Sequence, residues 1–352
     1  TVKNFGAFDE LLCFECTSTS YMNLLEFQRQ LAETVVNVGL NVQENEQLMI
    51  IKSSNDDFST NLLDQITAQV QKRGASIVQV ILNEKMQNLM SLSPINDSFR
   101  YCLFPCPNEA WAQELFGGEN ALAQLINSLK TAVLVDYAQL DEELHRRERI
   151  LNSLNLKQII CTSPTTGTFL TLGLNKAIWT GGSCKDPKTG VNFWHNLPSF
   201  EVFSAPNMFE VQGKAVMTRP WQLDALQVQE LEVSFENGMV TNVNSQQKEQ
   251  VEIFLETNQN AKYLGEIAIV DRYSPINLQK VVFRNVLLDE NACCHIAFGQ
   301  AYSYSGAEAC TLNQSNVHQD IMIGTDDMNV DGVTTDDEII PILVDGEWLL
   351  YE

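Results

Sequence analysis

The sequence predicts an α/β domain with a parallel sheet over residues 1–170, followed by a mainly β or α+β domain over residues 171–352. Three observations lead to this fold class. A strand, helix, strand pattern lies near the N-terminus, turn-forming residues become dense after about residue 170, and strand-like apolar runs dominate beyond them.

The first half of the chain alternates between helical and strand-like patterns. Residues 21–39 carry apolar side chains near helical spacing, which predicts a helix. The apolar segments 47–52 and 76–82 flank a helical stretch over 59–73, a unit typical of a parallel sheet. The pattern recurs, with helices expected over 120–130 and 141–154 and strands over 131–137 and 157–162.

The second half is rich in turns and short apolar runs. A boundary or long loop is expected where turn formers cluster, at Gly173, Gly181, Gly182, Pro187 and Gly190. Residues 236–238, Glu-Asn-Gly, separate two apolar runs and predict a β-hairpin over 230–243. Further strands are expected over 264–270, 281–288 and 319–323.

The charge balance excludes two classes of partner. The 352 residues include 22 Lys and Arg against 45 Asp and Glu, a formal net charge of -23. Binding to nucleic acids or to anionic membranes depends on Lys and Arg, so neither partner is expected. Between Asn285 and Glu352 there is no Lys or Arg but there are thirteen Asp and Glu. Bound metal or a solvated acidic surface would each account for this excess.

Cysteine usage and the N-terminus bear on the cellular compartment. Nine cysteines in a large chain argue against a disulfide scaffold, and free buried thiols are the default expectation. A four-thiolate zinc site would require the fold to join Cys13 and Cys16 to Cys102 and Cys106. The sequence has no basic and apolar leader and no run of about 18 apolar residues, so a cytoplasmic location is expected.

Histidine is scarce enough for each one to be weighed. His145 lies in a charged helical stretch and is expected at the surface, and His195 beside Trp194 is expected to pack or to hydrogen-bond. His318 and Asp320 share one face if residues 319–323 form a strand. They then form either a platform for a divalent cation or a hydrogen-bonded structural pair.

Three more candidates lie in apolar surroundings. If residues 295–302 are helical, His295 and Tyr302 meet on one face, as a metal-binding imidazole with an oxyanion-stabilising phenol or as two core residues. Glu201 and Glu266 each interrupt an apolar run. A carboxylate buried there needs a cation or a full shell of hydrogen bonds, unless it points to solvent from an edge strand.

Four segments resemble the aminopeptidase T and aminopeptidase S metallopeptidase family in order and in most of their spacing: residues 196–206, 264–270, 289–295 and 316–324. The resemblance spans nearly the whole chain and is most specific after Asn196. It implies a dimer in which the second domain, residues 171–352, carries the metal ions.

The resemblance also implies a site and an activity. It places two divalent metal ions, whether zinc, cobalt, manganese or magnesium, on Glu201, Glu266, Glu290, His295, His318 and Asp320. The metals would activate water for hydrolysis of peptides with a free N-terminus, and Tyr302 would stabilise the oxyanion. Two features depart from the family: the segment between His295 and His318 is shorter, and Phe169 stands where many members have a small acidic residue.

Two alternatives remain open at the level of sequence. Ring-cleaving dioxygenases of similar fold hold one iron with two histidines and one carboxylate, and a scaffold protein would hold no metal. The dioxygenase would have no need of Glu201 or Glu290 and would be expected to carry His at position 266. The retained glutamates therefore favour hydrolysis.

Overall fold

The computed structural model describes residues 23–52, 56–82, 100–174, 176, 178–223, 226–302 and 310–351. The chain forms two compact units. Among the described residues, the first unit takes those within 1–86, 100–135 and 190–197, and the second those within 136–189 and 198–352. No described helix is long and apolar enough to cross a lipid bilayer.

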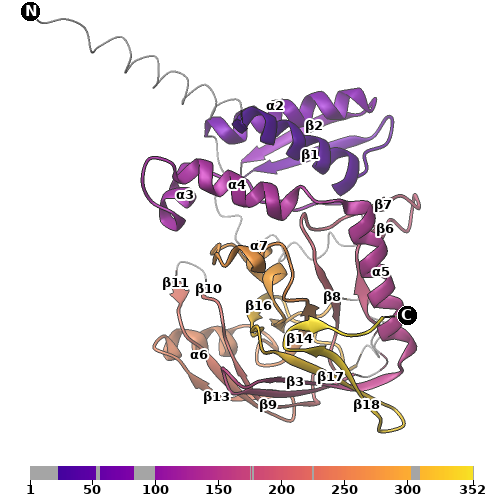
Figure 1. Cartoon of the computed structure of the whole chain (residues 1–352), viewed down its shortest axis with the longest axis vertical. Helices are drawn as coiled ribbons and strands as arrows, with labels where there is room; N and C mark the ends of the chain where they lie inside the picture. Colours follow the sequence, from indigo (N-terminus) through magenta and orange to yellow (C-terminus); the bar gives the residue numbers. More distant parts are fainter. Residues whose placement is uncertain are drawn as a thin grey trace, which may run out of the picture. The chain divides into compact units, whose positions relative to one another are not determined.

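The first unit contains the predicted strand, helix, strand pattern. β1 (Gln47–Lys52) and β2 (Ser76–Leu82) pair in parallel and are connected by α2 (Asp57–Lys72), as Figure 1 shows. The helix begins where the Asp56 carboxylate accepts a hydrogen bond of 2.7 Å from the Ser59 N–H. Residues 23–34 are helical and continue into a π turn, η1 (Val35–Gly39), which confirms the described part of the helix predicted over 21–39; Tyr21 and Met22 lie outside the described residues.

The strand predicted over residues 131–137 is wrong. α4 (Ala121–Val133) occupies the start of this segment, residues 134–136 form a bend and a second helix begins at Tyr137. Leu125, Leu129, Ala132 and Val133 are buried on one apolar face of α4, which explains the helix. The apolar run thus begins in the last turn of a helix. The remaining elements of this unit are α3 (Glu109–Leu115) and β7 (Asn192–Phe193).

The larger sheet of the second unit is antiparallel, with strand order β13-β12-β9-β4-β3-β17-β18-β19. The expected recurrence of the parallel unit is therefore wrong, since β3 pairs antiparallel with β4 and β17. The strands are β3 (Leu156–Ser163), β4 (Thr168–Gly173), β9 (Val211–Val216), β12 (Glu232–Glu236), β13 (Met239–Asn244), β17 (Asn329–Thr334), β18 (Ile339–Val344) and β19 (Glu347–Trp348).

The two compact units divide the chain differently from the expected boundary between residues 170 and 171. The second unit begins at Asp136 and so includes α5 (Tyr137–Ser153). It also includes β3 and β4, which lie within its large sheet. The hairpin predicted over 230–243 is confirmed as β12 and β13. Asn237 and Gly238 both have positive φ values, 50° and 83°, as a tight hairpin turn requires.

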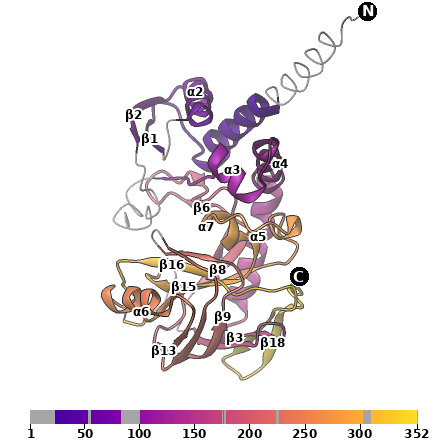
Figure 2. The same ribbon diagram turned by 90° about the vertical axis from the view of Figure 1, so that its left-hand side faces the viewer.

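The smaller sheet has five antiparallel strands in the order β16-β15-β14-β8-β5. They are β5 (Thr180–Gly181), β8 (Glu201–Ser204), β14 (Leu264–Val270), β15 (His295–Gly299) and β16 (His318–Met322). The two sheets lie in separate layers (Figure 2), and the rings of Phe235 on β12 and Phe298 on β15 meet between them at 6.3 Å. The unit also contains β6 (Cys184–Lys185), β10 (Trp221–Leu223), β11 (Leu226–Val228) and α6 (Lys248–Thr257).

The segment between β14 and β15 is not the strand predicted over 281–288. It contains η3 (Asn277–Gln279), α7 (Val286–Asp289) and η4 (Glu290–Ala292). Asp289 determines this conformation, because its buried carboxylate accepts hydrogen bonds from the Phe283 and Asn285 N–H groups and pairs with Arg219 at 2.9 Å. Burial raises the pKa of Asp289, and the Arg219 guanidinium opposes that shift.

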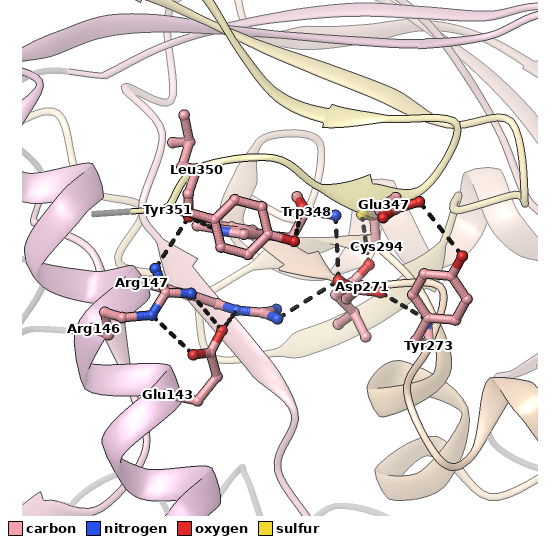
Figure 3. Close-up of polar contacts among 11 residues, drawn as sticks. Glu143, Arg146, Arg147, Asp271, Tyr273, Cys294, Glu347, Trp348, Leu350 and Tyr351 are labelled. Carbon is pink, nitrogen blue, oxygen red and sulfur yellow. Dashed lines mark hydrogen bonds and ion pairs between the residues drawn. The ribbon is translucent and has the colours of Figure 1, made fainter.

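The C-terminal segment supports the ends of the same two strands (Figure 3). The guanidinium of Arg147 on α5 lies 4.7 Å from the Trp348 ring centroid and 3.6 Å from the Asp271 carboxylate. Asp271 also accepts a hydrogen bond from the Trp348 N–H. Next to Asp271, the Cys294 thiol contacts the Val270 carbonyl at 3.5 Å. This network joins the end of β14 to the start of β15.

We expect Arg219→Met to lower the free energy of unfolding by about 3–5 kcal/mol, because it leaves the Asp289 carboxylate buried without its cation. Chemical denaturation measures the loss. Lys214→Met, which removes the cation of a partly exposed pair with Glu232, is the matched control and should cost at most about 1 kcal/mol. Equal losses in the two variants would contradict a special role for the buried pair.

Candidate metal centre

The register of the smaller sheet gathers polar side chains on one face. Residues two apart on a strand share a face, and cross-strand partners lie on the same side of the sheet. Ala268 pairs with His295 on one side and with Phe203 on the other. Ala297 likewise pairs with Glu266 and Asp320, so all of these residues lie on the same face of the sheet. That face contains Glu201, Phe203, Glu266, Ala268, His295, Ala297, His318 and Asp320. The opposite face is mostly apolar, with Ile267, Ile269, Ile296, Phe298 and Ile321 buried.

Five of the predicted site residues meet in two overlapping groups. The ligand atoms of Glu201, Glu266 and His295 lie within 4.8 Å of one another, and so do those of Glu266, His318 and Asp320. Nε2 of His295 is 3.1 Å from Oε2 of Glu201 and 4.0 Å from Oε1 of Glu266. Nε2 of His318 is 3.1 Å from Oε2 of Glu266 and 3.2 Å from Oδ1 of Asp320. Glu266 therefore turns one oxygen toward each imidazole.

The orientation of the two imidazoles suits metal ligation. Nδ1 of His318 lies 2.7 Å from the Gln300 carbonyl oxygen, and Nδ1 of His295 lies 3.3 Å from that of Cys293. A carbonyl only accepts hydrogen bonds, so Nδ1 carries a proton in each ring. Nε2 then faces carboxylate oxygens, an arrangement that requires either a second proton or a cation between nitrogen and oxygen.

A buried carboxylate oxygen without a hydrogen-bonding partner is a second indication that the site binds a cation. Oε2 of Glu201 is buried and lies 3.1 Å from Nε2 of His295, but it makes no regular hydrogen bond within the described chain. Two ligand atoms that each lie about 2.1 Å from one ion at a tetrahedral angle are about 3.4 Å apart, close to the separations observed. The donor set of imidazole nitrogen and carboxylate oxygen thus fits divalent metal ions.

The electrostatics of the metal-free site favour protonation. Burial opposes a charged His295, but contact with Glu201 and the charges of Asp320 and Glu266 outweigh it and raise the pKa well above the usual value. The pKa of His318 is likewise well raised, because Asp320 and Glu266 overcome the effect of burial. Burial and neighbouring carboxylates raise the pKa of Glu266, and they raise that of Glu290 by more.

Glu290 and Tyr302 lie beside the two groups rather than in them. Glu290 is buried in η4, where Asp320 and Glu201 influence its pKa, but it belongs to neither group of mutually close ligand atoms. The helix expected over 295–302 is wrong, because His295 begins β15 and pairs with β14 and β16. Tyr302 follows that strand and still reaches the site, with its ring centroid 5.3 Å from that of His318 and 5.7 Å from that of Phe203.

The other candidates lie elsewhere. His145 is partly exposed on α5 and contacts Asp141. His195 packs against the rings of Tyr101 and Phe193, and burial lowers its pKa to about 4. Cys13 and Cys16 lie outside the described residues, while Cys102 and Cys106 are free thiols whose pKa burial raises. Part of the short segment between His295 and His318, residues 303–309, also lies outside the described residues.

Two alanines complete the site and were not predicted. Ala268 on β14 lies opposite His295 on β15 and Phe203 on β8, on the same face as Glu201. Ala297 on β15 lies between β14 and β16 in the same way, beneath the side chains of Glu266 and Asp320. Both alanines are fully buried. Their alternation with Glu266 and His295 in the sequence is the signal that could have identified them.

Comparison with known proteins identifies the family. The family model described as thermophilic metalloprotease (M29) matches residues 85–348. The chain belongs to the M29 metalloprotease family. This confirms the expected resemblance, since curated members that match the chain include aminopeptidases T and S.

Named relatives share about a third of the matched residues. Aminopeptidase T of Thermus aquaticus is 34% identical over 270 residues, and aminopeptidase 2 of Geobacillus stearothermophilus is 32% identical over 270 residues. These alignments cover 71% and 70% of this chain but only 65% of each relative. The structure of wild-type AmpT from Thermus thermophilus matches with a TM-score of 0.80 at 25% identity, covering 92% of this chain and 99% of that one.

The raised pKa values predict how the stability of the metal-free M29 chain depends on pH. Folded His295 and His318 retain protons that the unfolded chain releases near pH 6.5, so their stabilisation is complete below that pH and is lost as pH rises through the folded pKa values. Glu266 and Glu290 act in the same direction from about pH 4.5 upward. We therefore expect the melting temperature in chelator to fall between about pH 6 and pH 9.

Thermal melts across this range measure the effect. His145→Gln, at a partly exposed histidine outside the site, should leave the slope unchanged, whereas His318→Gln should reduce it. A wild-type melting temperature that rises across the range, or equal slopes for wild type and His318→Gln, would contradict the prediction.

Proposed function

We propose that this chain is a metal-dependent aminopeptidase that removes N-terminal residues from peptides by means of a dinuclear metal-activated water. The observation that carries the proposal is the pair of overlapping ligand groups joined by the two oxygens of Glu266. The names of the matching relatives support it, because they are aminopeptidases. None of these relatives is named as a dioxygenase or a scaffold protein, so neither alternative gains support.

In this proposal the sheet face holds two divalent ions, such as zinc, cobalt, manganese or magnesium. Glu201 and His295 would bind one ion, His318 and Asp320 the other, and Glu266 would bind both. Glu290, buried beside them, would complete the ligand set. When bound, the ions would activate a water molecule, polarise the scissile carbonyl and bind the free amino group of the substrate.

The ligand residues balance charge and hold the site rigid. Four carboxylates, Glu201, Glu266, Glu290 and Asp320, would neutralise two dications. The carbonyls of Cys293 and Gln300 fix the imidazole rings through Nδ1, so that each Nε2 points toward the ion position. Because the five proposed ligands other than Glu290 lie on paired strands, little reorganisation is required when substrate binds.

Tyr302 would act on the reacting carbonyl. Its ring is held between those of Phe203 and His318, which places a phenol beside the proposed ligands. The hydroxyl would donate a hydrogen bond to the oxygen on which negative charge develops. The proposal also includes the homodimer that the family resemblance implies, and a cytoplasmic location.

We expect Glu266→Gln to abolish both metal retention and peptide hydrolysis, because one neutral amide cannot replace a carboxylate shared by two cations. Elemental analysis of the purified protein and assays with aminoacyl chromogenic substrates, with and without chelator, provide the two measurements. Glu256→Gln, at an exposed position near Lys262, is the matched control and should keep both properties.

Metal content separates the candidate functions. Two zinc, cobalt, manganese or magnesium ions per wild-type chain support the peptidase, one iron would indicate the dioxygenase, and none would indicate a scaffold. Undiminished hydrolysis by Glu266→Gln would refute the assigned site.

We expect Tyr302→Phe to lower kcat about 10²–10³-fold with little change in KM, because the lost hydrogen bond forms in the transition state. Steady-state kinetics on the same aminoacyl substrates measure both constants. Tyr351→Phe, at an exposed residue whose hydroxyl donates to the Trp348 carbonyl, should match wild type. A Tyr302→Phe enzyme with unchanged kcat would exclude this role for the phenol.

A further inference from the structure

Asn291, which follows Glu290 in η4, is a fully buried residue with an unusual set of partners. Its Oδ1 accepts a hydrogen bond of 2.6 Å from the Phe200 N–H. Its Nδ2 donates to the Leu287 carbonyl at 3.0 Å and to Oε1 of Glu290 at 3.3 Å. One amide thus contacts three separate points of the chain.

The bond to Phe200 connects Asn291 with β8. Phe200 immediately precedes Glu201, the first residue of that strand. A buried Phe200 N–H without a partner would cost free energy, so its hydrogen bond to the side-chain Oδ1 of Asn291 favours one position for the start of β8. The Glu201 carboxylate is directed toward His295 from that position.

The bond to Glu290 acts on a second carboxylate. Glu290 is buried among like charges from Asp320 and Glu201, which would push its carboxylate away from them. A neutral N–H donor can hold the carboxylate without adding a positive charge that would compete with a metal ion. The Ser274 hydroxyl donates to the Asn291 backbone carbonyl at 2.6 Å, a contact that does not involve the side-chain amide.

We propose that Asn291 is a positioning residue for the metal centre, whose single amide sets both the Glu290 carboxylate and the start of the strand that carries Glu201. This inference rests on the proposed function, because it assigns the amide a role toward two proposed ligands. A purely structural amide would influence folding stability alone. A positioning amide must also influence metal affinity.

The test uses the full chain stripped of metal with chelator and titrated with Zn²⁺ or Co²⁺. We expect Asn291→Ala and Asn291→Asp to weaken binding of at least one ion by about 10–100-fold and to change the visible spectrum of the Co²⁺ protein. Asn291→Asp is nearly isosteric and keeps an acceptor for the Phe200 N–H, but it loses the donor to Glu290. If Asn291→Ala does not fold, the measurements on Asn291→Asp alone decide the test.

Ser274→Ala is the matched control. It removes a hydrogen bond from the same buried network but leaves the Asn291 amide intact, so it should lower the melting temperature of the metal-free protein while keeping wild-type metal affinity. If the wild type binds two ions and the Asn291 variants bind both with unchanged affinity and spectrum, the inference is wrong and the proposed function stands. If the wild type binds no divalent ion, the proposed function fails and the inference fails with it.

Discussion

The register of one antiparallel sheet is the constraint on which the rest of the site depends. The side-chain period of a strand is two residues, so a shift of one residue would turn the whole polar set into the core and the isoleucines outward. The apolar face of β14, β15 and β16 packs on the larger sheet, as the contact between Phe235 and Phe298 shows. Hydrophobic packing on one side therefore specifies which residues meet on the other.

Charge on the polar face has to be balanced by protons or by metal. No Lys or Arg occurs between Asn285 and Glu352, and the buried cation nearby, Arg219, is paired with Asp289. In the metal-free chain the neighbouring carboxylates raise the pKa of His295 and of His318, which favours the protonated imidazoles and so reduces repulsion between the carboxylates. Protons and divalent ions thus compete for the same lone pairs, and metal affinity is coupled to pH.

Sequence patterns predicted the elements whose periodicity is unambiguous and missed those whose short apolar runs suit either conformation. The strands 47–52, 76–82 and 264–270 and the hairpin at Gly238 were predictable. The strand at residues 295–299 was not predictable, because the seven-residue spacing of His295 and Tyr302 carries no information about its pairing with β14 and β16. The shared face of His318 and Asp320 followed from strand spacing alone, whereas the meeting of Glu201 with His295 depends on non-local pairing through β14.

The two buried alanines beneath the site have a consequence for how such a centre can diverge. Ala268 lies next to His295 and Phe203 on the neighbouring strands, and Ala297 lies between Glu266 and Asp320. A branched side chain at one position would fill the volume above a single strand and spread one ligand pair while leaving the other in place. In the proposed dinuclear centre, one such substitution would therefore disturb one ligand pair while leaving every ligand residue unchanged.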